Sequence, residues 1–226
     1  MLELAAENLG EMLEEVVFVG DASLGLWISD PGAPPVRPTK DVDVIVEVTT
    51  RSEFHAFEER LRRQRFDEDQ EDGVICRKRH RDSGLILDVI PSAGEILGFE
   101  NRWQREALPH ARHVTLPSGR IVRAASPPYL LATKLEAFGS RGGGDFLGSR
   151  DFGDVVVLID GREELVDEVH TAEHGLRRYL ADTLTALSQE RGFEYGLSGA
   201  LLPDEASQAR ADIVVRPRMR RIAAGA

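Results

Sequence analysis

DVDVIVEV at residues 41–48 is the stretch that decides the fold, because valine recurs at every second position. Side chains of a β-strand point alternately to its two faces, so the four valines share one face, which suits a buried core. The other face carries Asp41, Asp43, Ile45 and Glu47. We therefore expect a strand with one core face and one face that begins with a carboxylate pair.

The two aspartates at the start of this strand lie roughly 7 Å apart, the spacing of alternate residues in a strand. Two like charges at that spacing repel each other, and a divalent cation relieves the repulsion. Mg²⁺ takes oxygen ligands and is commonly held by one or two carboxylates together with substrate phosphates. The sequence therefore predicts a metal site at Asp41 and Asp43. The alternative is a solvent-facing edge strand with two harmless aspartates.

A third carboxylate, Asp88, stands alone among aliphatic residues in LILDVI at residues 85–90. Aspartate is rarely buried unless it is paired or bound to a metal. A second strand next to the first would bring Asp88 to the aspartate pair, and we expect it to complete the metal site. A helix or turn cap, or a buried ion pair, is the alternative.

A glycine turn precedes these strands. VVFVG at residues 16–20 predicts a short buried strand that ends at Gly20, and Ser23 follows in the first turn of a short helix. A glycine turn that enters a helix exposes backbone N–H groups to an anion. Gly20 and Ser23 are therefore candidate phosphate contacts, although many ordinary strand–helix corners look the same.

A lysine interrupts the apolar side of the helix predicted at PPYLLATKLEAFGSR, residues 127–141. Lys134 has leucine, alanine and phenylalanine three and four positions away, which is costly unless its ammonium reaches water or an anion. Arg141 lies about two turns further along the same face. Together they could grip a triphosphate. A snorkelling lysine and an arginine that favours a helix C-terminus are the alternative.

Two acidic residues begin the next predicted helix, with Ser149 as a candidate N-cap. Asp151 and Asp154 are favourable in a first helical turn of any protein. The functional alternative is that Asp151 reaches Lys134, where it would orient the lysine or act as a base.

Outward from these motifs, the pattern mixes strands and helices up to Ser126 and becomes helical from Pro127. We expect helices at 2–14, 22–29 and 50–64, a loop at 30–39, strands at VICRKRH and LILDVIP, and a hairpin at 111–126. DVVVLID at 154–160 fits a strand or a buried helix. The predicted fold is α/β (α+β): an α/β domain at 1–126 and a mainly helical lobe at 127–226.

Composition limits the classes of protein. The chain has 226 residues and a formal net charge of −11, which argues against general nucleic-acid binding. Basic runs at 77–81 and 216–221 could still hold RNA, or be a solvated strand and tail. One cysteine, Cys76, suits a reducing compartment. The N-terminus lacks the basic start and apolar core of a signal peptide, and no apolar run is long enough for a bilayer, so we expect a cytoplasmic protein without a membrane partner.

The order of these motifs resembles a known family. A glycine turn with serine, then RPTKDVD, a lysine helix with K-x(6)-R, and SRDxxD together resemble the nucleotidyltransferase superfamily, and within it the AbiEii/AbiGii toxin-like proteins, including the mycobacterial MenT toxins. The resemblance runs from about Val16 to Gly161. It implies a polymerase-beta-like core with a mixed sheet, and transfer of a nucleoside monophosphate from an NTP with Mg²⁺ (or Mn²⁺) and release of pyrophosphate.

The resemblance also implies roles for individual residues. Phosphate contacts fall to Gly20 and Ser23, metal binding to Asp41 and Asp43, triphosphate binding to Lys134, and further acidic catalysis to Asp151, with Asp88 as the third strand carboxylate. The implied acceptor is a tRNA 3′ end or a protein hydroxyl, and a toxin role implies an antitoxin partner.

One residue departs from the family pattern. Asp21 stands where the family often has a second glycine, and an acid beside a phosphate is unfavourable unless it faces away or helps a metal. This leaves a non-catalytic nucleotide-binding or interaction protein as an alternative. Independently of Asp21, the acceptor could also be a small molecule.

Overall fold

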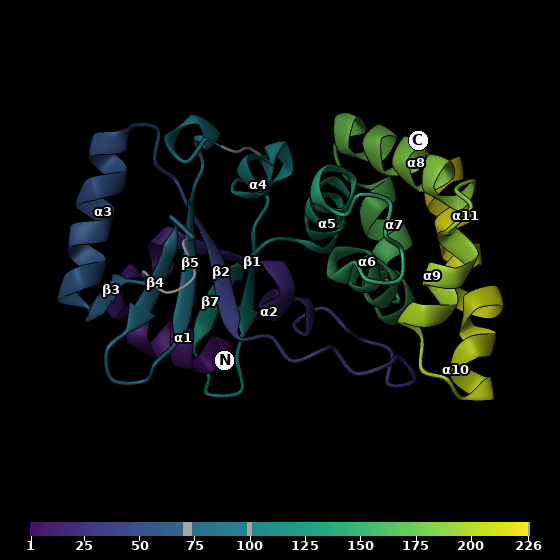
Figure 1. Cartoon of the computed structure of the whole chain (residues 1–226), viewed down its shortest axis with the longest axis horizontal. Helices are drawn as coiled ribbons and strands as arrows, with labels where there is room; N and C mark the ends of the chain where they lie inside the picture. The colour runs from purple at the N-terminus through teal and green to yellow at the C-terminus, as the bar shows by residue number, and fades with distance from the viewer. Residues whose placement is uncertain (70–73, 99–100, 226) are drawn as a thin grey trace. The chain divides into compact units, whose positions relative to one another are not determined.

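The computed structural model describes residues 1–69, 74–98 and 101–225, which form two compact units (Figure 1). The first unit contains Met1–Ser23 and Arg37–Ser126, and the second contains Leu24–Val36 and Pro127–Ala226. The boundary expected after Ser126 is also where the chain passes from one unit to the other. The segment Leu24–Val36, which the sequence places in the first domain, belongs to the second unit.

A mixed β-sheet organises the first unit. Its strands within the described residues are β1 (Val16–Val19), β2 (Asp41–Val46), β3 (Phe66–Glu68), β4 (Arg77–His80), β5 (Ile86–Pro91), β6 (Arg112–Thr115) and β7 (Ile121–Ala124). They lie in the order β3-β4-β5-β2-β1-β7-β6 (Figure 1). The pairs β2–β5 and β1–β7 are parallel and the others antiparallel. The α+β class and the hairpin at 111–126 are confirmed.

The aspartate strand is central. β2 lies between β5 and β1, so the alternative of a solvent-facing edge strand is wrong. Val42 and Val44 are fully buried, whereas Asp41 and Asp43 are half-buried on the other face. Valine and aspartate therefore alternate along β2 because one face of the strand lies in the core and the other leaves these two carboxylates accessible.

Along the chain, the helices of the first unit alternate with the strands of this sheet. They are α1 (Leu2–Leu9), the 3₁₀ turn η1 (Gly10–Glu15), α2 (Gly20–Leu24), α3 (Arg51–Arg63), the 3₁₀ turn η2 (Gly94–Ile96) and α4 (Arg102–Ala107). A capping box fixes the start of α3: Thr50 accepts a hydrogen bond from the Glu53 amide, and Glu53 accepts one from the Thr50 amide. The helix expected at 2–14 stops earlier because Gly10 adopts φ 55° and ends the α-helix.

The helix expected at 22–29 is also displaced. α2 begins at Gly20 and ends at Leu24. Beyond it the amide of Trp27 donates to the carbonyl of Leu24 at 3.1 Å, and the amides of Ser29 and Asp30 donate to the carbonyl of Gly161 at 2.9 and 3.0 Å. β3 and α4 are not foreseen in the sequence analysis, since both are too short for a periodic pattern.

The second unit is helical, as expected. It contains α5 (Pro127–Arg141), α6 (Arg150–Gly161), α7 (Leu165–His170), α8 (His174–Ser188), α9 (Phe193–Ala200), α10 (Glu205–Arg210), the π-helix η3 (Ala211–Val215) and α11 (Arg216–Ala224). The ambiguous stretch 154–160 is the buried part of α6. Ser149 caps this helix by accepting from the Phe152 amide at 3.3 Å.

An ion-pair network joins the segment Leu24–Val36 to the rest of the second unit. Arg210 donates through Nε to both carboxylate oxygens of Asp160, at 2.9 and 3.0 Å, and through its other nitrogen to Asp30. Asp160 is fully buried, and this burial raises the pKa of its carboxyl group, with Arg210 acting in the opposite direction. Arg210 thus stabilises a charge that has no access to water.

Replacing Arg210 with methionine should lower the free energy of unfolding by about 3 kcal/mol at pH 7.5, because Asp160 is left buried without its principal cation. The loss should shrink at pH 5, since a carboxyl group with a raised pKa can take up a proton there. Urea denaturation at the two pH values measures both effects. Arg178→Met, at an exposed pair with Asp182, is the control and should change stability very little; an equal loss in both variants would contradict the expectation.

Candidate functional site

The sheet of the first unit brings the predicted strand carboxylates to one place. The parallel register of β2 and β5 sets Asp43 directly beside Asp88 and Asp41 beside Ile86. Residues in register on neighbouring strands are about 4.8 Å apart and point to the same face. Asp88 therefore lies next to the aspartate pair, as the sequence indicates.

A guanidinium group lies between two of these carboxylates. Arg77, in register with Asp88 across β4 and β5, donates to Asp88 through Nε at 2.9 Å and through a terminal nitrogen at 2.8 Å. The same terminal nitrogen donates to Asp41 at 2.8 Å. Asp41 also accepts from the hydroxyl of Thr39 at 2.7 Å. Asp88 thus has the buried ion pair that the sequence allows as an alternative to metal binding.

The glycine turn packs against the second aspartate. Gly20 has φ 68°, and a Cβ atom built on it would lie 2.0 Å from the Oδ2 atom of Asp43. Any other residue would force the Asp43 carboxylate away. The sequence recognises Gly20 as a turn residue, but its direct contact with Asp43 becomes visible only in the fold.

The other turn residues have partners of their own. Ser23 is fully buried, and its hydroxyl donates to the carbonyl of Gly20 at 2.9 Å, so it closes the turn in this structure instead of facing an anion. Asp21 pairs with Arg37 at 2.8 Å. The acid that departs from the family pattern is therefore accompanied by a cation from the same unit.

Cys76, directly before Arg77, has a thiol whose pKa is affected by the negative charge around this site. Burial raises the pKa of its thiol to about 11, and the negative charges of Asp88 and Asp43 act in the same direction. The residue is accordingly a neutral thiol at physiological pH, and a nucleophilic role is unsupported.

Cys76 should react with a thiol reagent at pH 8 roughly a hundredfold more slowly in the folded protein than in the unfolded chain, because about two pKa units separate the two thiols. The rate of disulfide exchange with an aromatic disulfide, with and without guanidinium chloride, measures this. Equal rates in the two states would show that the thiol is neither buried nor surrounded by negative charge.

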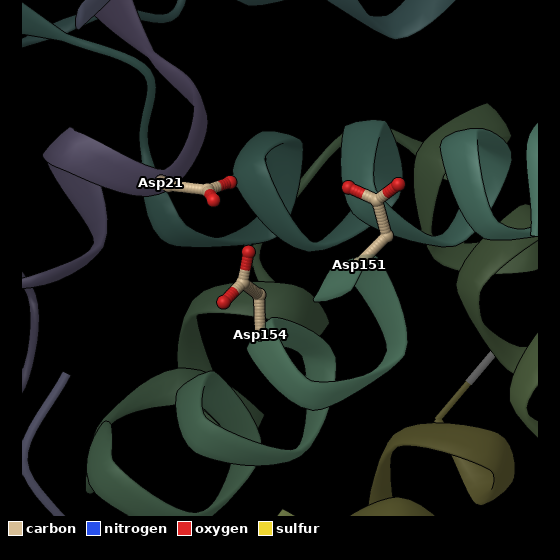
Figure 2. A group of neighbouring side chains, drawn as sticks. All are labelled: Asp21, Asp151 and Asp154. Atoms are coloured by element: carbon tan, nitrogen blue, oxygen red, sulfur yellow. The ribbon is translucent and has the colours of Figure 1, made fainter. Parts of the chain in front are cut away.

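The second unit holds a separate charged cluster on α5 and α6. The ammonium of Lys134 lies 2.6 Å from Asp154 and 3.3 Å from Asp151, and Arg141 approaches Asp151 at 3.0 Å. Lys134, Asp151 and Asp154 are all buried, whereas the side chain of Arg141 is 73% exposed. The two carboxylates project from successive turns of α6 (Figure 2). The expectation that Asp151 reaches Lys134 is borne out by these distances.

The nearest partner of Lys134 is a residue that the sequence analysis left aside. Asp154 is three positions after Asp151 and shares its helix face, but its place near the start of α6 is explained equally well by helix capping. The spacing D-x-x-D was the available signal. Formally, two cations and two carboxylates balance here, and the exposed Arg141 is the cation that can turn toward an external anion.

The first basic run is not a solvated strand, because Lys78 and His80 are buried, whereas the second run lies on a helix in which Arg220 and Arg221 are exposed. In the first run, the partners are Asp41 and Asp88 for Arg77, Glu58 for Lys78, Asp69 for Arg79, Ser83 for His80 and Asp67 for Arg81. In the second, Arg216 pairs with Glu194 and Asp212, Arg221 approaches Asp167, and Arg218 donates to the carbonyls of Ile159 and Asp160. Acidic residues offset most of the charge of the first run, so it gives no support to RNA binding, and the exposed arginines of the second run fit a solvated tail.

The family follows from comparison with known proteins. The sequence profile described as the AbiEii nucleotidyl transferase toxin of type IV toxin–antitoxin systems matches residues 4–224. The chain belongs to this family. A comparison with curated proteins returned no match. The AbiEii match confirms the resemblance and the α+β nucleotidyltransferase fold class, and it extends well beyond Gly161, where the motifs recognised in the sequence end.

Membership in the AbiEii family makes the chain a nucleotidyltransferase of the toxin type, with an antitoxin as the expected partner of such a system. Among the described residues, the structure contains no helix that is both long enough and apolar enough to span a bilayer.

Proposed function

We propose that this protein transfers a nucleoside monophosphate from an NTP to an acceptor hydroxyl, with Mg²⁺ or Mn²⁺ bound at the strand carboxylates. The observation that carries the proposal is the placement of Asp43, half-buried on a central strand, beside Asp88 and against a glycine turn that no side chain can occupy. The AbiEii family supports the same class of reaction.

The residues fit a divalent cation. All candidate ligands are carboxylate oxygens, the ligand type that Mg²⁺ prefers. Three strand carboxylates and the guanidinium of Arg77 leave an excess of two negative charges, which matches one Mg²⁺ ion. Asp41 and Asp43 would hold the ion, with Asp88 next to them.

When bound, the metal would favour ionisation of the acceptor hydroxyl and neutralise charge on the departing pyrophosphate. Gly20 would let the backbone approach the phosphates closely, and Ser23 would keep the turn closed. Lys134 and Arg141 would contact the triphosphate, and Asp151 would orient both cations.

We propose a macromolecular acceptor, either the 3′ end of a tRNA or a protein hydroxyl, and a toxic outcome in the cytoplasm that an antitoxin counteracts. The family supports the toxin role, and the single cysteine suits a reducing compartment. The non-catalytic alternative depended on Asp21. Its pairing with Arg37 removes the main objection to phosphate binding beside this turn.

The test incubates the purified protein with each α-labelled NTP, Mg²⁺, and either total RNA or total protein from a cell extract. Label that enters RNA or protein with one preferred NTP, and that is absent with Asp43→Asn, supports the proposal and identifies the acceptor class. Label found only in a small-molecule fraction would show that the acceptor is a small molecule and not a macromolecule. Tight NTP binding without any transfer would establish the non-catalytic alternative.

A further inference from the structure

Arg77 differs from the other arginines of its basic run, Arg79 and Arg81, in its lower exposure and in its partners. Its side chain is 13% exposed and its guanidinium lies on Asp41 and Asp88. Arg81, just beyond the same strand, is 54% exposed and pairs with Asp67 at the surface. Of these two arginines, Arg77 is the one that pairs with the carboxylates of β2 and β5.

Arg77 donates to both carboxylate oxygens of Asp88. Two nitrogens of Arg77 meet its two oxygens at 2.9 and 2.8 Å, the parallel fork that fixes both groups in direction. Asp41 accepts from the guanidinium through its Oδ2 atom. A cation approaching Asp88 would therefore meet a carboxylate whose two oxygens both already accept from a fixed positive charge.

We propose that Arg77 is a positioning residue that withholds Asp88 from metal coordination, so that the site takes one divalent cation, held by Asp41 and Asp43. The inference rests on the metal site of the proposed function and specifies its stoichiometry. Arg77 provides, without dissociating, the positive charge that a second ion would bring, and its guanidinium bonds to both Asp88 and Asp41.

The experiment counts bound Mn²⁺ by electron paramagnetic resonance of the free ion, using the full chain at pH 7.5. The wild type should bind one ion. Arg77→Gln should bind a second ion, because Asp88 is released and one positive charge is removed. Arg81→Gln, which makes the same charge change at the surface pair, should still bind one ion. A folded Arg77→Gln protein that binds one ion with unchanged affinity would overturn the proposal.

The double variant Arg77→Gln/Asp88→Asn keeps the net charge of the site and replaces the ion pair with two amides, so it provides a test even where the single variant folds poorly. It should bind one Mn²⁺ ion with an affinity close to that of the wild type. If Asp88 is instead a metal ligand, affinity should fall at least about tenfold, and that result overturns the proposal, as does a wild type that binds two ions or none.

Because the readout is metal binding, the inference and the proposed function fail separately. The expected pattern of Mn²⁺ binding in a protein that transfers no nucleotide would uphold the role of Arg77 and refute the transferase. Transfer activity together with two ions bound to the wild type would support the transferase and refute the proposed role of Arg77.

Discussion

Asp43→Asn should lower kcat/KM for nucleotide transfer by about a thousandfold, equivalent to about 4 kcal/mol of transition-state stabilisation, because it removes a proposed metal ligand. The melting temperature should change little, since asparagine and aspartate have nearly the same shape and volume. Asparagine preserves the shape that fits against Gly20. Steady-state pyrophosphate release and a thermal melt measure the two effects.

Glu47→Gln is the matched control for this experiment. Glu47 follows the same strand and is exposed, so the change removes one carboxylate charge without touching the site. We expect its activity to stay within about twofold of the wild type, as for a surface substitution. Equal activity losses in the two variants would mean that overall charge, and not a ligand at position 43, controls the reaction.

Lys134→Met should have the second largest effect, on both stability and activity. Removing this buried ammonium leaves Asp154 and Asp151 with Arg141 as their remaining neighbouring cation from the cluster, and loss of one partner of a buried pair costs about 3–5 kcal/mol. Transfer activity should also be lost, because Lys134 is the proposed triphosphate contact. Urea denaturation and NTP binding provide the measurements.

The double variant Lys134→Met/Asp154→Asn separates these two consequences. It removes one positive and one negative charge together, so most of the lost stability should return. NTP binding should remain as weak as in the single variant. Recovery of binding along with stability would show that Lys134 serves only to hold α5 and α6 together.

The strands of the site could be predicted because their sequence signal is local. The alternating valines of β2 and the aliphatic residues around the single charge of β5 both indicate a buried strand, and both strands are present in the structure. The same holds for α3, whose capping box and apolar spacing lie within one segment. Where a feature depends on its own residues alone, the sequence is sufficient.

The failures at the charged clusters and at the domain boundary involve partners that are distant in the chain. Arg77 reads as part of a solvated basic run, and only the register of β4 against β5 reveals that it faces Asp88. Asp154 reads as a helix-start acid until α5 brings Lys134 to it. The segment Leu24–Val36 looks like the end of a helix and a loop of the first domain, yet Arg210, far along the chain, pairs with its Asp30. Tertiary pairing decides each of these cases.

The metal dependence of transfer tests the central claim most directly. Pyrophosphate release from the preferred NTP and acceptor would be followed in wild type and Asp43→Asn, first in EDTA and then with increasing Mg²⁺ or Mn²⁺. Our account predicts no release in EDTA, full recovery of the wild type with either ion, and no recovery of Asp43→Asn at any concentration that saturates the wild type. Release that continues in EDTA, or a variant that recovers fully, would contradict a metal site at these strand carboxylates.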